Sequence, residues 1–229
     1  MDHLFFDLFG QAPGGSSATI VALSALGSLL TGVALLLLAR RSDLGWWVQI
    51  LAVFAGPLAT ALLFDATGLL ASLPAMGIAA YGLWRFSKYP MAGRFRRAVQ
   101  VRGFAPAQML WGAAIVAVFT VLGLGPMLTS GFALSGGTAS IWLSMVFGAV
   151  VTAGLVGLAN GVRWAWLAIA AASVAYVVLF FGSQPALATL AGLVFQFGAS
   201  AYGWRVWRQM PAEATAGPVE AYPPSPYST

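Results

Sequence analysis

The sequence is dominated by long runs of apolar residues that contain no charged side chain. Crossing about 30 Å of hydrocarbon takes roughly 20 helical residues. Helices are the spanning structure open to such runs, because backbone polar groups cannot stay unpaired in lipid. Only 7% of the residues are charged, against roughly 25% in soluble domains. The chain is therefore predicted to be an all-α integral membrane protein.

Seven stretches have the length and composition of a membrane span: about 18–39, 44–64, 66–84, 104–128, 138–159, 164–182 and 185–204. Pro57 in the second stretch and Pro74 in the third would break a helix in water. Membrane helices tolerate proline where neighbouring groups satisfy the freed carbonyl. We therefore expect both stretches to be spans.

Two parts of the chain share an order of features. "LARRSDLGWWVQ" leads to "AAYGLWRF" in the first half, and "LANGVRWAW" leads to "SAYGWRVW" in the second. Trp46 precedes Tyr81 by 35 residues, and Trp166 precedes Tyr202 by 36. Such a recurrence indicates an internal repeat. Two three-helix units joined by a single helix keep the same orientation, which makes them parallel repeats in a 3+1+3 pattern.

The predicted organisation has six parts. They are an interfacial N-terminal segment (1–16), a first three-helix bundle (17–88), a basic cytoplasmic loop (89–103), a linker helix (104–128), a second three-helix bundle (138–208) and a disordered tail (209–229). The N-terminal segment is short and amphipathic. The tail is rich in Pro, Ala and Ser and poor in large apolar residues.

The basic residues fall only in alternate connections. They are Arg40 and Arg41; Arg85, Lys88, Arg94, Arg96, Arg97 and Arg102; Arg163; and Arg205 and Arg208. With seven crossings, these connections share one side of the membrane, which the positive-inside rule assigns to the cytoplasm. The protein is then expected in the cell (inner) membrane, with its N-terminus outside and its C-terminus cytoplasmic.

The net charge of +5 would also suit nucleic-acid binding, through the stretch "RFRRAVQVR". A basic loop is what the topology already requires, and it can touch anionic lipid. The predicted partner is therefore the lipid bilayer and not a nucleic acid.

The spans contain no internal Asp, Glu, Lys, Arg or His, so they lack the ionisable relay typical of proton-coupled transporters. The sequence also lacks a phosphate-binding loop, a carboxylate pair and cysteine, and it has one histidine, His3. We expect no enzymatic activity, no cofactor and no metal site. Sodium coupling through backbone carbonyls stays open.

Aromatic and amide side chains inside the spans are the candidates for binding a neutral, ring-containing solute. The candidates are Trp47, Gln49, Trp142, Ser144, Trp166, Ser173, Tyr176 and Gln196. The serines have an alternative role in bonding neighbouring helices or their own backbone. Trp46 and Trp164 are interpreted as interface anchors. Tyr81 and Tyr202 are candidate gates at the inner ends of two spans.

The repeat resembles the PnuC family of vitamin transporters, relatives of the SWEET sugar facilitators, over residues 17–208. The resemblance rests on the 3+1+3 pattern, on "GWWVQ" and "RWAW" at the start of two spans, and on the Tyr-Gly endings. It implies facilitated diffusion of a B-vitamin precursor by a homotrimer. Nicotinamide riboside is the first expectation, and riboflavin and thiamine are alternatives. A membrane scaffold that transports nothing is the alternative from another class.

Overall fold

The computed structural model describes residues 15–58, 68–88, 99, 101–102, 106–129, 139–181 and 187–210. The described elements are all helical: α2 (Gly15–Ala39), α3 (Leu44–Val53), the π-helix η1 (Phe54–Leu58), α5 (Gly68–Ser87), α6 (Pro106–Thr129), α7 (Ala139–Ala159), α8 (Ala165–Phe181) and α9 (Leu187–Gln209). The all-α prediction is confirmed, and every predicted span has its helix. The interfacial segment before Gly15, most of the basic loop and the tail beyond Met210 lie outside the described residues.

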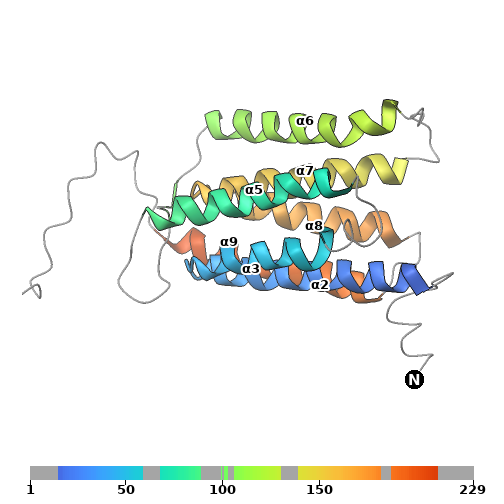
Figure 1. Cartoon of the computed structure of the whole chain (residues 1–229). Coiled ribbons are helices and arrows are strands. Elements are labelled where there is room, and N and C mark those ends of the chain that lie inside the picture. Colours follow the sequence, from blue (N-terminus) through green and yellow to red (C-terminus); the bar gives the residue numbers. More distant parts are fainter. Residues whose placement is uncertain are drawn as a thin grey trace, which may run out of the picture.

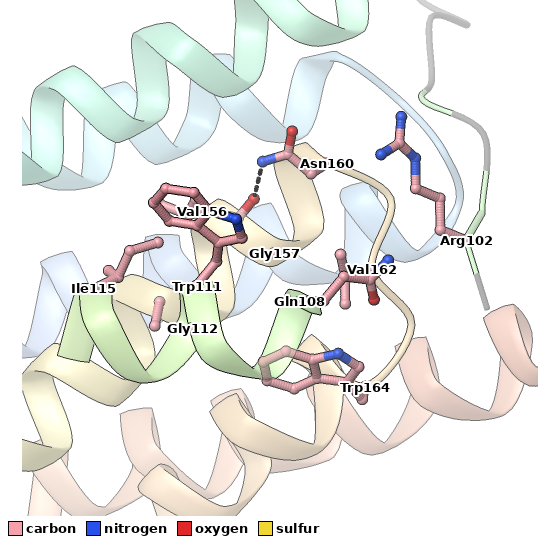
Figure 2. A pocket seen from close by; sticks show the side chains of 11 residues that line it. Arg102, Gln108, Trp111, Gly112, Ile115, Val156, Gly157, Asn160, Val162 and Trp164 are labelled. Atoms are coloured by element: carbon pink, nitrogen blue, oxygen red, sulfur yellow. Dashed lines mark hydrogen bonds between the residues drawn. The ribbon is translucent and has the colours of Figure 1, made fainter. Parts of the chain in front are cut away.

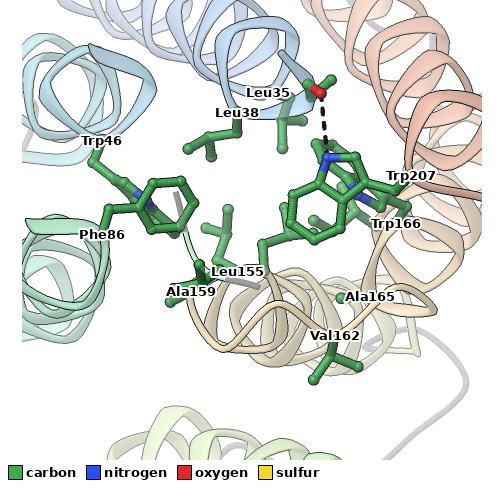
Figure 3. Close-up of a cluster of buried hydrophobic side chains, with 14 of the residues drawn as sticks. Leu35, Leu38, Trp46, Phe86, Leu155, Ala159, Val162, Ala165, Trp166 and Trp207 are labelled. Atoms are coloured by element: carbon green, nitrogen blue, oxygen red, sulfur yellow. Dashed lines mark hydrogen bonds between the residues drawn. The ribbon is translucent and has the colours of Figure 1, made fainter. Parts of the chain in front are cut away.

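Among the described elements, six helices form a closed ring, seen end-on in Figure 3, and α6 stands outside it (Figure 1). Around the ring each helix packs on the next in the order α2, α3, α5, α7, α8, α9 and back to α2. The linker helix α6 packs on α7. Because α2, α3 and α5 correspond to α7, α8 and α9, the two bundles meet where α2 contacts α9 and where α5 contacts α7.

The first helix of each bundle ends in the same way. The amides of Arg41 and Ser42 bond back to the carbonyls of Leu38 and Leu37, at 2.9 and 3.1 Å. In α7, Gly161 and Val162 bond to Leu158 and Gly157 at 3.0 and 2.8 Å. This pair of bonds is a Schellman motif, which needs a left-handed residue. Arg41 (φ 58°) and Gly161 (φ 76°) occupy that position, so the repeat extends to the backbone.

The glycine of each Tyr-Gly pair seats a tryptophan ring. A Cβ added at Gly82 would lie within 3.0 Å of the Trp46 ring, and one at Gly203 would lie as close to the Trp166 ring. Both tryptophan side chains are fully buried. The interpretation of Trp46 as an interface anchor was therefore wrong. An indole that packs directly on the helix backbone leaves no room for a side chain at that residue, which is why glycine recurs in both Tyr-Gly pairs.

A second aromatic residue, one turn after each glycine, completes the contact. Phe86 meets Trp46 edge-on at 5.7 Å between ring centroids, and Trp207 meets Trp166 at 5.4 Å. Trp207 also donates its indole N–H to the carbonyl of Ala39 at 3.2 Å, which ties α9 to the end of α2. These aromatic side chains belong to one buried cluster, to which all six helices of the closed ring contribute (Figure 3).

The two prolines have different effects on their helices. Pro74 lies inside a continuous α5, whereas Pro57 lies in η1, where α3 changes to π-helical turns. Proline lacks the amide that would continue the α-helical bonding, and π-turns are one way a helix absorbs that loss. Next to Pro57, Gly56 packs on Gly27 of α2, and a Cβ on either residue would come 3.0 to 3.1 Å from the other's Cα.

Length and hydropathy identify one stretch, Ala22–Ala39 in α2, as able to cross a membrane by itself among the residues described. Shorter apolar stretches occur at Leu44–Gly56, Pro106–Leu122, Met145–Ala159 and Ala165–Leu179. In the described helices, the basic residues lie in the last turns of α5 and α9, at the end of the ring where α2 and α7 also finish. We call this the basic end.

The close contact between each indole and its glycine predicts that the same glycine substitution lowers the free energy of unfolding in both bundles. Gly82→Ala and Gly203→Ala each force a methyl group into an indole ring and should lower the free energy of unfolding by about 1–3 kcal/mol. Gly77→Ala and Gly198→Ala are matched controls in the same helices, because a Cβ there meets nothing within 4 Å. Thermal unfolding of the four variants in detergent tests this. Equal midpoints for test and control variants would show that the ring contact contributes nothing.

Candidate functional site

Five buried polar residues lie in the described part of the chain: Asp43, Gln49, Ser173, Gln196 and Ser200. Asp43 precedes α3 at the basic end. The four neutral residues lie inside the helices of the ring, on α3, α8 and α9. An amide or hydroxyl away from water is costly unless it finds a partner, so the bonding of these four residues shows which of them have capacity left.

Gln49 has unused hydrogen-bonding capacity. Its side chain is 6% exposed, and its Oε1 has no hydrogen-bond partner among the described residues. It shares the buried face of α3 with Gly45, Trp46, Ala52 and Val53. The Oγ of Ser200 on α9 is also buried and unpartnered in this part of the structure. Sequence analysis did not select Ser200, because its hydroxyl resembles that of any serine in an apolar helix.

Gln196 and Ser173 bond to protein backbone. Gln196 donates from Nε2 to the carbonyl of Ser28 on α2 at 3.1 Å, across the junction between the two bundles. Ser173 donates its hydroxyl to the carbonyl of Ile169, one turn earlier in α8, at 2.9 Å. Both bonds are structural. The bond of Gln196 uses its Nε2 and not its Oε1.

The tryptophan candidates occupy different places. Trp166 is fully buried, and its indole N–H has no partner among the described residues; the same holds for Trp46. Trp47 is 53% exposed and points away from the ring interior, so the structure does not bring it together with Gln49. Trp46 is thus the inward member of the "WW" pair. Sequence periodicity alone did not distinguish the two.

The remaining candidates on α7 and α8 are placed only in part. Tyr176 is partly buried and meets Phe147 of α7 edge-on, with 5.7 Å between ring centroids. Its hydroxyl would lie 3.3 Å from a Cβ placed on Gly148. Trp142 and Ser144 belong to α7, but their side chains lie outside what the structure describes.

The two candidate gate tyrosines are not equivalent. Tyr81 donates its hydroxyl to Oδ1 of Asn160 at 2.9 Å, which links α5 of the first bundle to the end of α7 in the second. Asn160 is held in turn by its own bond to the carbonyl of Val156, at 2.8 Å. Tyr202 is 39% exposed on the outside of α9. Tyr81 therefore bridges the bundles at the basic end, and Tyr202 faces the surroundings of the ring.

A short segment crosses the basic end of the ring. Val99 and Val101 are 2% and 4% exposed and belong to the buried aromatic cluster. Arg41 donates a side-chain bond to the carbonyl of Val99 at 3.1 Å, and the amide of Arg102 donates to the carbonyl of Gly161 at 2.7 Å. We call Val99, Val101 and Arg102 the strap. It is held by the turn that ends the first helix of each bundle.

Together these groups suit a polar solute that carries no negative charge. An unpartnered amide oxygen on Gln49 and an unpartnered hydroxyl on Ser200 lie inside α3 and α9. The unpartnered indole N–H groups of Trp46 and Trp166 lie in the first turns of α3 and α8, at the basic end. No cluster of His, Cys, Asp or Glu that could hold a metal occurs among the residues described. The solute would meet aromatic faces and neutral hydrogen-bonding groups.

The comparisons with known proteins agree with this geometry. A model of the nicotinamide mononucleotide transporter family matches residues 21–209. The chain belongs to this family. A solved structure titled "Crystal structure of the Vitamin B3 transporter PnuC" matches with a TM-score of 0.59 and 15% identity, over 88% of this chain and 94% of that one. A search of curated proteins found no match.

Family membership makes the ring the body of a membrane transporter and not of an enzyme, as the sequence resemblance implied. The 3+1+3 fold expected from that resemblance is confirmed. At 15% identity the solved transporter supports the fold alone.

The two glutamines should respond differently to loss of their amides. Gln49→Met removes an unpartnered acceptor, so folding stability should hold, while the affinity for the solute falls about tenfold. Gln196→Met removes the bond to Ser28 and should also lower the free energy of unfolding, by about 1 kcal/mol. Thermal unfolding and solute titration of both purified variants test this. A destabilised Gln49→Met protein with unchanged affinity would contradict the assignment.

Proposed function

We propose that this protein carries nicotinamide riboside across the cell membrane by facilitated diffusion. The observation that carries the proposal is the set of buried, neutral and unpartnered polar atoms on Trp46, Gln49, Trp166 and Ser200. A ribose needs donors and acceptors of this neutral kind. The positively charged pyridinium ring of the riboside is attracted to the face of an indole.

The charge distribution favours the riboside over its phosphorylated form. A mononucleotide carries a phosphate ester, which proteins pair with Arg or Lys. In the described helices, Arg85, Arg205 and Arg208 lie at the basic end. Gln49 lies further along α3 than Trp46, and Ser200 precedes Arg205 in α9 by more than one turn. Buried neutral groups alone would leave a phosphate poorly compensated.

The same distribution supports passive transport. The spans offer no ionisable relay for protons. Movement of the solute would then follow its own gradient, and removal of the solute inside the cell would supply the direction. The strap and the Tyr81–Asn160 bond are the contacts that must rearrange for the basic end to open.

The basic end is proposed to face the cytoplasm. The positive-inside rule assigns the clustered Arg and Lys residues to that side, with the N-terminus outside and the C-terminus inside. Trp142, Ser144, Ser173, Tyr176 and Gln196 are retained as candidate contacts for the solute.

Counterflow in proteoliposomes tests the solute directly. Vesicles loaded with unlabelled nicotinamide riboside should accumulate the labelled compound without a proton gradient, and equally in sodium-free buffer. Labelled nicotinamide mononucleotide should not exchange, because the interior lacks a partner for its phosphate. The Gln49→Met variant should need about tenfold more solute for the same rate.

Each other outcome has its own meaning. Exchange of riboflavin or thiamine in place of the riboside would favour the alternative vitamins in the same fold. A stable, folded protein that exchanges none of these compounds would favour the scaffold. Loss of exchange when sodium is removed would show ion coupling.

The assembly is proposed to be a homotrimer, as the family resemblance implies. The side chains of Leu110, Trp111, Val121 and Leu122 on α6 are 61–73% exposed, so this helix presents a wide apolar face to lipid or to another copy. Native mass spectrometry from detergent should give three times the 23.8 kDa mass of the chain. A monomer under conditions that retain transport activity would contradict the trimer.

A further inference from the structure

A crevice of about 340 Å³ lies outside the ring, between α6 and the end of α7 (Figure 2). Its walls come from α6, from the last turns of α7 and from the turn that leads into α8, with the strap at its mouth. It is separate from the buried polar groups of the ring. Trp164 closes one side, and a Cβ on Gly112 of α6 would lie 2.9 Å from its ring.

The crevice carries polar groups at the basic end. Arg102 lies exposed at the mouth, and its backbone is fixed there by the bond to Gly161. The indole N–H of Trp164 and Oε1 of Gln108 are buried and have no partner among the described residues. The first turn of α6 begins at Pro106, beside these groups, and the positive end of a helix favours an anion.

Deeper in, the lining becomes apolar, with Ile115, Val156 and the exposed ring of Trp111. A site with a cation and a helix N-terminus at the level of the helix ends, and with apolar walls further along α6 and α7, matches a phospholipid in shape and polarity. Basic pockets between membrane helices bind anionic headgroups in this way. A free anion would leave the apolar half of the crevice unused.

We propose that this crevice binds one anionic phospholipid, whose phosphate lies against Arg102 and whose chains follow the groove between α6 and α7. Arg102 ends the strap, and the strap carries Val99 and Val101 into the core. A lipid bound at Arg102 therefore holds α6 and the strap together at the basic end. The inference does not depend on which solute is carried.

The experiment compares lipids on the whole protein, stripped of lipid in a neutral detergent. Mixed micelles with phosphatidylglycerol should raise the midpoint of thermal unfolding above that with phosphatidylcholine, because a ligand of the folded state stabilises it. Native mass spectrometry should show one retained phosphatidylglycerol per chain. Arg102→Gln should weaken this binding about tenfold, since a charge-assisted bond is lost while the backbone bond remains.

One further variant keeps the test specific. Arg208→Gln removes an equal charge from the exposed end of α9, away from the crevice, and should bind phosphatidylglycerol like the unmodified protein.

Three results would overturn the proposal. Equal stabilisation by the two lipids would show that the headgroup charge is not recognised. Equal losses in Arg102→Gln and Arg208→Gln would show a diffuse attraction to the basic end. Full stabilisation by inorganic phosphate would assign the site to a free anion.

Discussion

Each bundle contains one tryptophan whose indole packs directly on a helix glycine, and the packing of the helices at the basic end depends on these two contacts. Trp46 on Gly82 joins α3 to α5, and Trp166 on Gly203 joins α8 to α9. A ring that touches backbone brings two helices closer than any pair of larger side chains allows. Hydrophobic attraction between helices is weak in lipid, so close packing of this kind holds the bundles together.

This packing separates two kinds of chemistry along the same helices. At the basic end, the aromatic side chains and the two strap valines fill the space between the bundles, and the Tyr81–Asn160 hydrogen bond links the bundles. Away from that end, neutral groups such as the amide of Gln49 are buried with capacity to spare. The described helices thus keep charge at the basic end and bury neutral groups further along.

Much of the architecture was predictable from local patterns. The spans, the repeat and the shared side of the basic residues follow from hydropathy and order along the chain, and the structure and family agree with the all-α, 3+1+3 prediction. The site was less predictable. Gln49, Trp166 and Gln196 are buried as expected, but Trp47 faces outward, Trp46 is core, and Ser200 went unnoticed.

By itself the sequence determined the all-helical class, the approximate positions of the helices and which of their connections are basic, because each depends on residues close together in the chain. Only the tertiary structure decided which face of each helix points inward. In lipid, the outer surface of a protein is as apolar as its core, so hydropathy cannot separate the two. The strap and the crevice beside α6 join residues far apart in sequence, and packing alone brings them together.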